Sequence, residues 1–241
     1  MAEVLAAVGA EGDVVGVVQH TDEPASMRRL PRVASARGVA LEAALRLEPT
    51  LAIAYTAGLP GLRRLEKLGV RVAVSHPRGV SEALDEIERI GRLAGRPRRA
   101  GRLADGLRGR LEAIRARRPR PPPRVFYEVA AEPLIGVGPG NFLDDVLREA
   151  GAVNVFADAP VANPRVSVEA VLRAGPDVLV LPGEPRQSAE RARFWRRRFG
   201  AQAPPHLPVP PDLLHRPGPR LIDGLEILQA GLLERSAEAP R

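Results

Sequence analysis

A long strand-free stretch in the middle of the chain constrains the fold more than any other feature. Between Pro97 and Arg118, alanine, leucine and isoleucine recur every three or four positions, which is the spacing of one face of an α-helix. Pro97 suits a first helical turn, and a group of prolines from Pro119 onward ends the helix. At 1.5 Å per residue this helix would be about 33 Å long, which is enough to join two parts of a protein.

On both sides of this helix, short β-rich runs alternate with helical patterns. The predicted strands are residues 14–18, 51–55, 70–74, 125–129 and 178–181. The predicted shorter helices are residues 3–8, 40–47, 62–68, 81–93, 141–150, 168–173 and 222–233. Strands that alternate with helices are typical of parallel sheets covered on both faces, so the predicted fold class is α/β.

A weak internal repeat indicates that the two sides are alike. Residues 41–53 match residues 168–180, and each copy predicts a short helix, a proline stop and a buried strand. A second match pairs Val4-Leu5 and Gly9-Ala10 with Val146-Leu147 and Gly151-Ala152. We expect an N-terminal α/β lobe at residues 1–96, a joining helix at 97–119 and a C-terminal α/β lobe at 120–241. Two such lobes suggest a ligand held between them.

Composition excludes several classes of function. The chain has no Cys, which removes disulfide scaffolds, thiol nucleophiles, iron–sulfur clusters and Cys-based zinc sites. The four His residues lie far apart, and no Ser lies in the Gly-x-Ser-x-Gly turn of a serine hydrolase. Because no catalytic set stands out, we expect that the protein is not an enzyme.

Positive charge is spread along the chain rather than gathered on one element. The net charge is +7, with 36 basic and 29 acidic residues. The densest cluster, around Phe194 and Trp195, predicts a solvated helix face whose aromatic side lies in the core, so no nucleic-acid partner is expected. No apolar run is long enough to span a membrane, and the first residues lack the basic start of a secretion signal. Taken literally, a start at Met1 predicts a cytoplasmic protein.

Several motifs in a fixed order resemble those of helical-backbone substrate-binding proteins, which serve ABC importers of cobalamin, haem and iron siderophores. The motifs are Val14-Val15-Gly16-Val17, Asp22-x-Pro24, Leu41-Glu42, Arg124-Val125-Phe126-Tyr127-Glu128-Val129, Gly138-Pro139-Gly140-Asn141-Phe142-Leu143, Pro164-Arg165-Val166-Ser167-Val168-Glu169 and Arg216-Pro217-Gly218-Pro219-Arg220. The resemblance covers the chain from Glu3 to Leu233 and is strongest to the cobalamin-binding branch. It implies two Rossmann-like lobes joined by a single long backbone α-helix.

The resemblance also implies a function and its partners. The chain is expected to capture a corrinoid, haem or ferric chelate between its lobes and to deliver it to the permease subunits of an ABC transporter. No intrinsic cofactor is implied, because cobalamin, haem or ferric siderophore is the cargo. The implied location is periplasmic, or extracytoplasmic with a membrane anchor, and the implied state is a monomer.

One departure from the family pattern concerns the first lobe. Family members begin with a β-strand and a Pro-Ser turn before the helix that matches residues 3–8, and this chain shows neither. We therefore expect the first strand of the N-terminal lobe to be missing, which would leave a gap in its sheet. A cytoplasmic corrinoid- or tetrapyrrole-binding relative without a transporter is the alternative that this departure favours.

By resemblance, Glu42 and Glu169 are the residues that dock on the permease. The repeat places them at equivalent positions, and two carboxylates on separate lobes would fix the orientation of the bound protein. The alternative is that each carboxylate only stabilises the N-terminal turn of its own short helix.

Ligand contacts are expected in loops that follow strands, because α/β sheets bind ligands at the carboxyl ends of their strands. The predicted ligand-binding residues are His20, Ala36, Tyr55, Ile135, Asn163, Asp212 and Arg216. By resemblance, His20 and Tyr55 stand where cobalamin binders have aromatic residues, and Asp212 and Arg216 match polar contacts. Ala36, Ile135 and Asn163 replace aromatic residues of the family, so a full corrin-stacking cage is not expected.

Each of these residues also has a purely structural interpretation. His20 would then be a solvated loop residue, Tyr55 a core residue at a strand end, and Arg216 a cap of the last helix. A metal-binding site within the protein is not predicted, although His20 or His215 is a candidate axial ligand for a metal in the cargo.

A glycine-rich loop at residues 136–140 supports the second alternative function, a small α/β nucleotide-binding enzyme. Such a loop before a helix resembles a phosphate cradle. Pro139 removes one amide donor, however, and no Lys follows the loop. A tight or ligand-lining turn with Asn141 as the helix N-cap is therefore the preferred interpretation.

Overall fold

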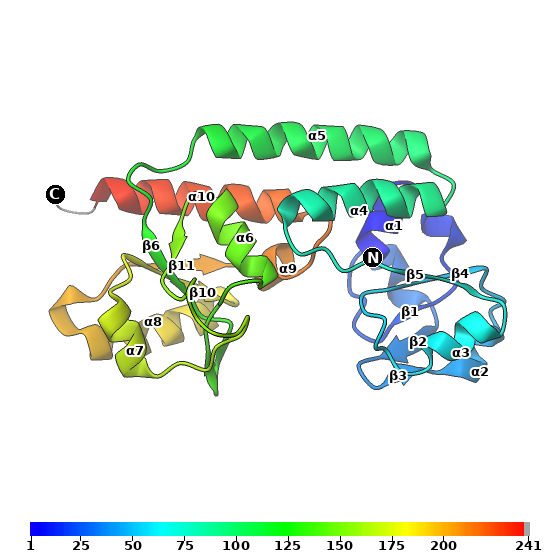
Figure 1. Cartoon of the computed structure of the whole chain (residues 1–241), viewed down its shortest axis with the longest axis horizontal. Helices are drawn as coiled ribbons and strands as arrows, with labels where there is room; N and C mark the ends of the chain where they lie inside the picture. The colour runs from blue at the N-terminus through cyan, green and yellow to red at the C-terminus, as the bar shows by residue number, and fades with distance from the viewer. Residues whose placement is uncertain (239–241) are drawn as a thin grey trace. The chain divides into compact units, whose positions relative to one another are not determined.

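The computed structural model describes residues 1–238, and its contacts divide the chain into two compact units (Figure 1). Unit 1 comprises residues 1–77 and 83–106, and unit 2 comprises residues 78–82 and the chain from residue 107 onward. Helix α5 runs from Pro97 to Ala116, so it begins at the predicted residue and contributes to both units. The division into lobes at residues 1–96 and 120–241 stays a prediction.

Unit 1 is built from short elements. They are α1 (Ala2–Ala7), η1 (Glu11–Asp13), β1 (Val17–Val18), η2 (Ala25–Arg29), β2 (Arg32–Ser35), β3 (Gly38–Val39), α2 (Leu41–Leu45), β4 (Leu51–Ala54), α3 (Leu62–Lys67), β5 (Arg71–Val74), and parts of α4 (Val80–Leu93) and α5. Strands β1, β2 and β3 form one sheet, and β4 and β5 pair in parallel in another. Strands β1 and β4 therefore belong to different sheets.

The first predicted strand is shorter than expected. The pattern predicts residues 14–18, whereas β1 is limited to Val17 and Val18. Just before it, the amides of Asp13 and Val14 donate to carbonyls only three residues earlier in a 3₁₀ turn. Because these amides are used locally, they do not join a strand ladder.

Unit 2 has a single larger sheet. Its elements are β6 (Arg124–Tyr127), β7 (Ala130–Ala131), β8 (Leu134–Ile135), α6 (Phe142–Glu149), β9 (Val153–Asn154), α7 (Val168–Ala174), β10 (Val178–Pro182), α8 (Pro185–Phe199), η3 (Gly200–Gln202), β11 (His206–Val209), α9 (Pro211–Leu214) and α10 (Leu221–Glu238). The four strands β11-β10-β6-β9 are parallel in that order. This sheet confirms the predicted α/β class.

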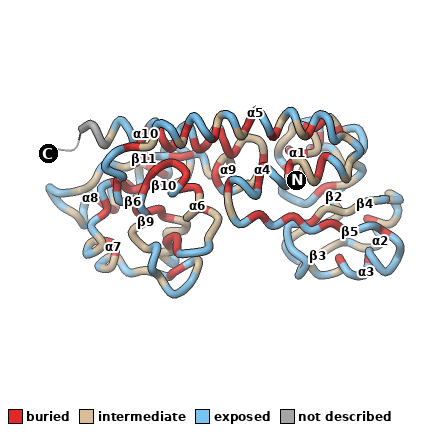
Figure 2. The backbone as a smooth tube through the Cα atoms, turned by 45° about the horizontal axis from the view of Figure 1, so that its top comes forward, coloured by how far each residue is buried: buried red, intermediate tan, exposed pale blue. Residues whose placement is uncertain are grey.

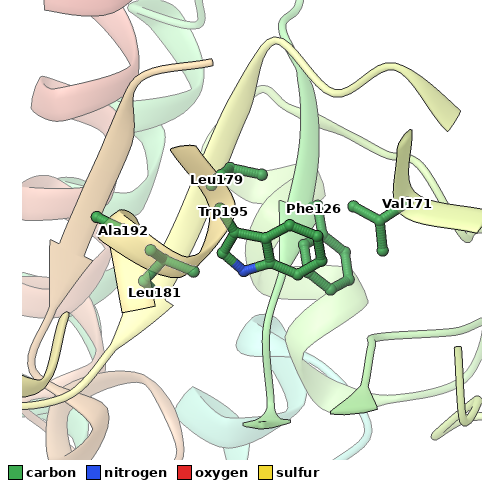
Figure 3. Packing of buried hydrophobic residues seen from close by; sticks show 6 residues of the cluster. All are labelled: Phe126, Val171, Leu179, Leu181, Ala192 and Trp195. Atoms are coloured by element: carbon green, nitrogen blue, oxygen red, sulfur yellow. The ribbon is translucent and has the colours of Figure 1, made fainter. Parts of the chain in front are cut away.

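Helices α7 and α8 pack on one face of the unit 2 sheet, around an aromatic core (Figure 3). Phe126 of β6 meets Trp195 of α8 edge to face, with ring centroids 5.5 Å apart. Trp195 is fully buried, as the sequence analysis predicted. Burying each large aromatic side chain contributes about 2–3 kcal/mol, so this cluster is a main source of stability for unit 2.

The structure confirms the longer of the two internal matches. Helix α2 and helix α7 open the two copies, and strands β4 and β10 close them. The strands begin at Leu51 and Val178, which are equivalent positions in the repeat. The short sequence match therefore corresponds to the same helix-to-strand unit in both parts of the chain.

The shorter match is confirmed by hydrogen bonds. Beyond α1, the amide of Ala10 donates to the carbonyl of Leu5 at 2.8 Å, and beyond α6 the amide of Ala152 donates to Leu147 at 2.9 Å. Both helices thus end in the same six-residue cap, whose glycine takes a positive φ.

No helix in the described part of the chain is both long enough and apolar enough to cross a membrane.

Candidate functional site

The predicted ligand residues of unit 1 all follow strand ends. Ala36 comes directly after β2, Tyr55 directly after β4, and His20 two residues after β1. All three are exposed, and Tyr55 keeps 45% of its surface accessible. The structural alternative that buries Tyr55 in the core is therefore wrong, and the residue is available to a ligand.

Tyr55 lies against His76, a residue that the sequence analysis did not select. The two rings are 4.5 Å apart between centroids and meet at 62°, edge to face. Strand pairing explains the contact, because Ala54 of β4 lies opposite Val74 of β5 and the chains continue in parallel beyond them. Partial burial raises the pKa of Tyr55, so its hydroxyl stays protonated at neutral pH. The two predicted strands, taken as neighbours, were the signal that could have identified His76.

The unit 2 residues at the end of β11 form a polar group. Asp212 lies on α9 and forms an ion pair with Arg216, in which Asp212 Oδ1 and Arg216 Nη2 are 2.9 Å apart. Nearby, the hydroxyl of Tyr127, which is fully buried, lies 2.9 Å from Nε2 of His215. Desolvation lowers the pKa of His215, although Asp212 works in the opposite direction, so the ring is neutral at physiological pH.

The remaining two predicted ligand residues belong to neighbouring segments. Ile135 is half-buried in β8 and forms an antiparallel bridge with Arg165. Asn163 is exposed, and its side-chain oxygen accepts a hydrogen bond from Asn141 Nδ2 at 2.7 Å. The structure thus brings these two segments of unit 2 together, beside the N-terminus of α6.

The glycine-rich loop before α6 uses its own amides. Gly136 and Gly138 donate to the carbonyls of Pro164 and Ala162 at 3.0 and 2.9 Å, and both glycines are buried. Asn141 caps α6 by accepting a bond from the amide of Leu143, as predicted. Amides that are already paired inside the protein do not cradle a phosphate, so the geometry favours a tight turn.

Glu42 and Glu169 occupy matching places, one in each unit. Each is exposed and is the second residue of its short helix, α2 or α7. Its own backbone amide and the Ser167 hydroxyl lower the pKa of Glu169. The equivalent placement predicted from the repeat is confirmed, and the docking role stays a prediction.

Comparison with known proteins shows one consistent similarity. The model of the periplasmic binding protein family matches residues 1–198. A vitamin B12-binding protein of Vibrio cholerae is 31% identical over 228 residues, which are 93% of this chain and 83% of that protein. The corresponding protein of Photorhabdus laumondii is 28% identical over 229 residues, 94% of this chain and 82% of the relative.

Solved structures give the same result. The periplasmic vitamin B12-binding protein of Vibrio cholerae superposes with a TM-score of 0.85 at 29% identity, covering 99% of this chain and 94% of that one. The periplasmic haem-binding protein of Roseiflexus has a TM-score of 0.83 at 27% identity, covering 98% and 95%.

Proposed function

The chain belongs to the periplasmic binding protein family, and we propose that it is the substrate-binding component of an ABC importer for a corrinoid, haem or ferric chelate. Within this range, a flat metal macrocycle, either a corrinoid or haem, is the cargo that the candidate site supports best. The role is binding and delivery to permease subunits, not catalysis. The chain would act as a monomer, in the periplasm or anchored on the outer side of the membrane.

The observation that carries the cargo class is the Tyr55–His76 ring pair. It presents an exposed aromatic surface and an imidazole nitrogen beyond the ends of two parallel strands. Aromatic rings bind flat apolar ligands, and neutral imidazole is a common ligand of iron and cobalt. Tyr55 is also the only Phe, Tyr or Trp residue in unit 1, and it lies on the surface of that unit rather than in its core.

Unit 2 would recognise the polar periphery of the cargo. The guanidinium of Arg216 is paired with Asp212 on an exposed surface, so a ligand carboxylate or amide oxygen can take the place of the aspartate. Side chains of Ile135 and Asn163 would add apolar and polar contacts. We assign no cage of stacked aromatic rings to this site, because the positions that would form one carry Ala36, Ile135 and Asn163.

Glu42 and Glu169 would hold the loaded protein on the permease. Both carboxylates are exposed, and each lies in the first turn of an equivalent helix. Two separate charge contacts on one rigid partner give an orientation that a single contact does not.

Titration with cyanocobalamin and with haemin, followed by absorbance and calorimetry, tests this proposal. We expect at least one macrocycle to bind with a dissociation constant of about 1 μM or less, about −8 kcal/mol. Tyr55→Ala and Arg216→Ala should each weaken binding about 10-fold or more, whereas Arg46→Ala, which changes an exposed residue at the end of α2, should not. If neither macrocycle binds, or if all three variants behave alike, the cargo assignment is wrong.

His76→Ala sharpens the choice between the two macrocycles. Loss of an imidazole ligand would change the haemin absorbance bands, whereas loss of ring contact alone would weaken cyanocobalamin and haemin similarly without a spectral change. His20→Ala separates the two histidine candidates, because His20 is also exposed after a strand but has no aromatic neighbour among the described residues. Haemin bands that change in His20→Ala and not in His76→Ala would assign the axial position to His20 instead.

A further inference from the structure

Helix α8 carries a cluster of positive charge that the ligand site does not use. Arg193, Arg196 and Arg197 lie three and four residues apart and are all exposed. Among the side chains described, those of residues 1–235, none of the three forms an ion pair or a hydrogen bond with another side chain. We call this set the α8 arginine face.

The orientation of the α8 arginine face is fixed from inside the protein. Glu128, which is buried at the end of β6, accepts hydrogen bonds from Arg191 at 2.5 and 2.8 Å and from the indole of Trp195 at 2.7 Å. These bonds satisfy a carboxylate that would otherwise be costly to bury. Because α8 cannot rotate without breaking them, the arginines on its other side point steadily toward solvent.

A small pocket of about 100 Å³ adjoins this face, between α8 and the start of β11. Arg196 and His206 supply its charged and titratable side chains, and Leu179, Ala192 and Pro205 supply apolar walls. A second cation stands close by, because Arg235 Nε donates to the carbonyl of His206 at 3.2 Å. Burial and the charges of Arg235 and Arg196 lower the pKa of His206. No carboxylate lines this pocket, so its electrostatic character suits an anion.

We propose that the α8 arginine face binds the anionic phospholipid surface of a membrane, with one headgroup phosphate held in the pocket beside Arg196 and His206. Guanidinium groups bind phosphate oxygens in a bidentate manner, and exposed arginines near an anionic bilayer each contribute to surface binding. This inference rests on the proposed function, because an importer component works next to a membrane.

The surroundings of the face favour lipid over nucleic acid. Binding of single-stranded nucleic acid uses exposed aromatic rings on which bases stack. Phe194, the partly buried ring next to Arg193 in the chain, packs against the unit 2 core, and the guanidinium carbons of Arg191 and Arg198 cover it at 4.1 and 3.6 Å from its centroid. A covered ring is not a stacking platform, whereas a row of guanidinium groups is sufficient for headgroup phosphates.

The position of α8 also connects the face with docking. Helix α7, which carries Glu169, packs with α8 on the same face of the unit 2 sheet, where Val171 and Trp195 share one core (Figure 3). Figure 1 shows both helices on the side of that sheet away from α10. If Glu169 meets a permease in the membrane, the α8 arginine face stands on the same side of unit 2, so lipid binding would orient the protein before docking.

Vesicle sedimentation with the full chain tests the proposal. We expect binding to vesicles that contain phosphatidylglycerol and none to vesicles of phosphatidylcholine alone, and binding should fall with added salt. The triple variant Arg193→Gln, Arg196→Gln, Arg197→Gln should lose affinity for the anionic vesicles on the order of 100-fold. His206→Ala should cause a smaller loss, because it removes one pocket donor and leaves all three arginines in place.

The matched control removes equal charge elsewhere. The triple variant Arg46→Gln, Arg63→Gln, Arg64→Gln changes three exposed arginines of unit 1 and should keep most of the vesicle affinity. Equal losses in both triple variants would show only a general effect of net charge and would overturn the proposal. So would the absence of vesicle binding, or tighter α8-dependent binding to a DNA oligonucleotide or to inorganic phosphate than to vesicles.

The same samples separate this inference from the proposed function. Both triple variants should bind cyanocobalamin or haemin as the unmodified chain does, because none of the six arginines belongs to the candidate ligand site. Vesicle binding without any macrocycle binding would disprove the cargo assignment and would still support membrane binding by the α8 arginine face. Macrocycle binding without α8-dependent vesicle binding would disprove only the membrane surface.

Discussion

Units 1 and 2 contain the same repeated motifs but bury them to different extents. Strand β10 is buried along four of its five residues and β6 along three of four, whereas β4 and β5 are each buried at a single residue (Figure 2). Unit 2 also holds every Phe and Trp of the chain. The same helix-to-strand motif therefore forms in both units, although the strands of unit 2 are more deeply buried than those of unit 1.

The helix caps next to α5 show the same contrast. At Gly151 an added Cβ would lie 2.7 Å from both Cβ and Cγ of Arg118 and 2.8 Å from Cδ of Pro119. At Gly9 its nearest neighbour would be the guanidinium end of Arg99, which can move away. The two caps therefore share the same hydrogen bond and a glycine with a positive φ. The glycine in unit 2 is more tightly surrounded by neighbouring atoms.

The largest expected effect comes from the aromatic core of unit 2. Trp195→Ala should reduce the free energy of unfolding by about 4 kcal/mol, because it opens a cavity and removes a donor from buried Glu128. Leu65→Ala in the small core of unit 1 should cost about 2–3 kcal/mol. Denaturant unfolding, followed by circular dichroism, measures both. A larger loss for Leu65→Ala would reverse the comparison.

The second effect distinguishes the two caps. Gly151→Ala should destabilise the protein by about 3 kcal/mol, since a positive φ of +86° and close backbone-proximal neighbours both oppose a Cβ. Gly9→Ala, at a φ of +76°, should cost about 1–2 kcal/mol because only a flexible side-chain end must shift. Equal thermal midpoints for the two variants would show that enclosure does not matter.

The third effect concerns the ion pairs at the two ends of α5. In unit 2, Glu149 is buried and bonds Arg115 and Arg118, whereas in unit 1 Asp13 pairs with Arg96 on the surface. We expect Glu149→Gln to cost about 2–3 kcal/mol and Asp13→Asn at most about 1 kcal/mol. Urea unfolding at neutral pH measures the difference.

This pair also gives a pH dependence of definite sign. Burial tends to raise the pKa of Glu149, but hydrogen bonds and charge from Arg115, with the charges of Arg118 and Arg148, outweigh it and lower the pKa. A carboxyl with a lowered pKa stabilises the fold above its unfolded value of about 4.3 and loses that contribution as pH falls through the folded value. Below neutral pH, the free energy of unfolding should fall less steeply with decreasing pH in Glu149→Gln than in the unmodified chain.

The smallest effect on stability is expected at the two exposed glutamates. Glu42→Lys and Glu169→Lys should each leave the free energy of unfolding nearly unchanged, because neither side chain is buried. Their effect should lie in delivery: both changes together should abolish stimulation of the importer's ATPase without altering ligand affinity. Ligand affinity that falls in parallel would contradict a docking role.

Much of the fold could be predicted because local periodicity records it. The helix at Pro97–Ala116 and the buried strand at Val178–Pro182 follow from patterns within about twenty residues. The equivalent positions of Glu42 and Glu169 follow from the match between residues 41–53 and 168–180. The length of strand β1 was overestimated, because an apolar run does not reveal that the amide of Val14, the first residue of the predicted strand, is used in a turn.

The candidate site could be predicted only in part. Tyr55 lies beyond the end of a predicted strand, whereas Asp212 and Arg216 follow β11, a strand that the sequence did not predict. Asp212 and Arg216 form an ion pair, and they are four residues apart, which helical spacing allows. His76 and the Tyr127–His215 hydrogen bond were not predicted. Both depend on which strands are neighbours, and spacing along one segment carries no such information.

The amino-acid sequence alone determined the α/β class, the central helix and the twofold use of one helix-to-strand unit, because these depend on the spacing of apolar residues, glycines and prolines. Only the tertiary structure decided that Tyr55 meets His76, that Glu128 fixes the rotation of α8, and that unit 2 is the more deeply buried half. Those outcomes depend on contacts between residues far apart in the chain, where packing and the need to pair buried polar groups select one arrangement among many.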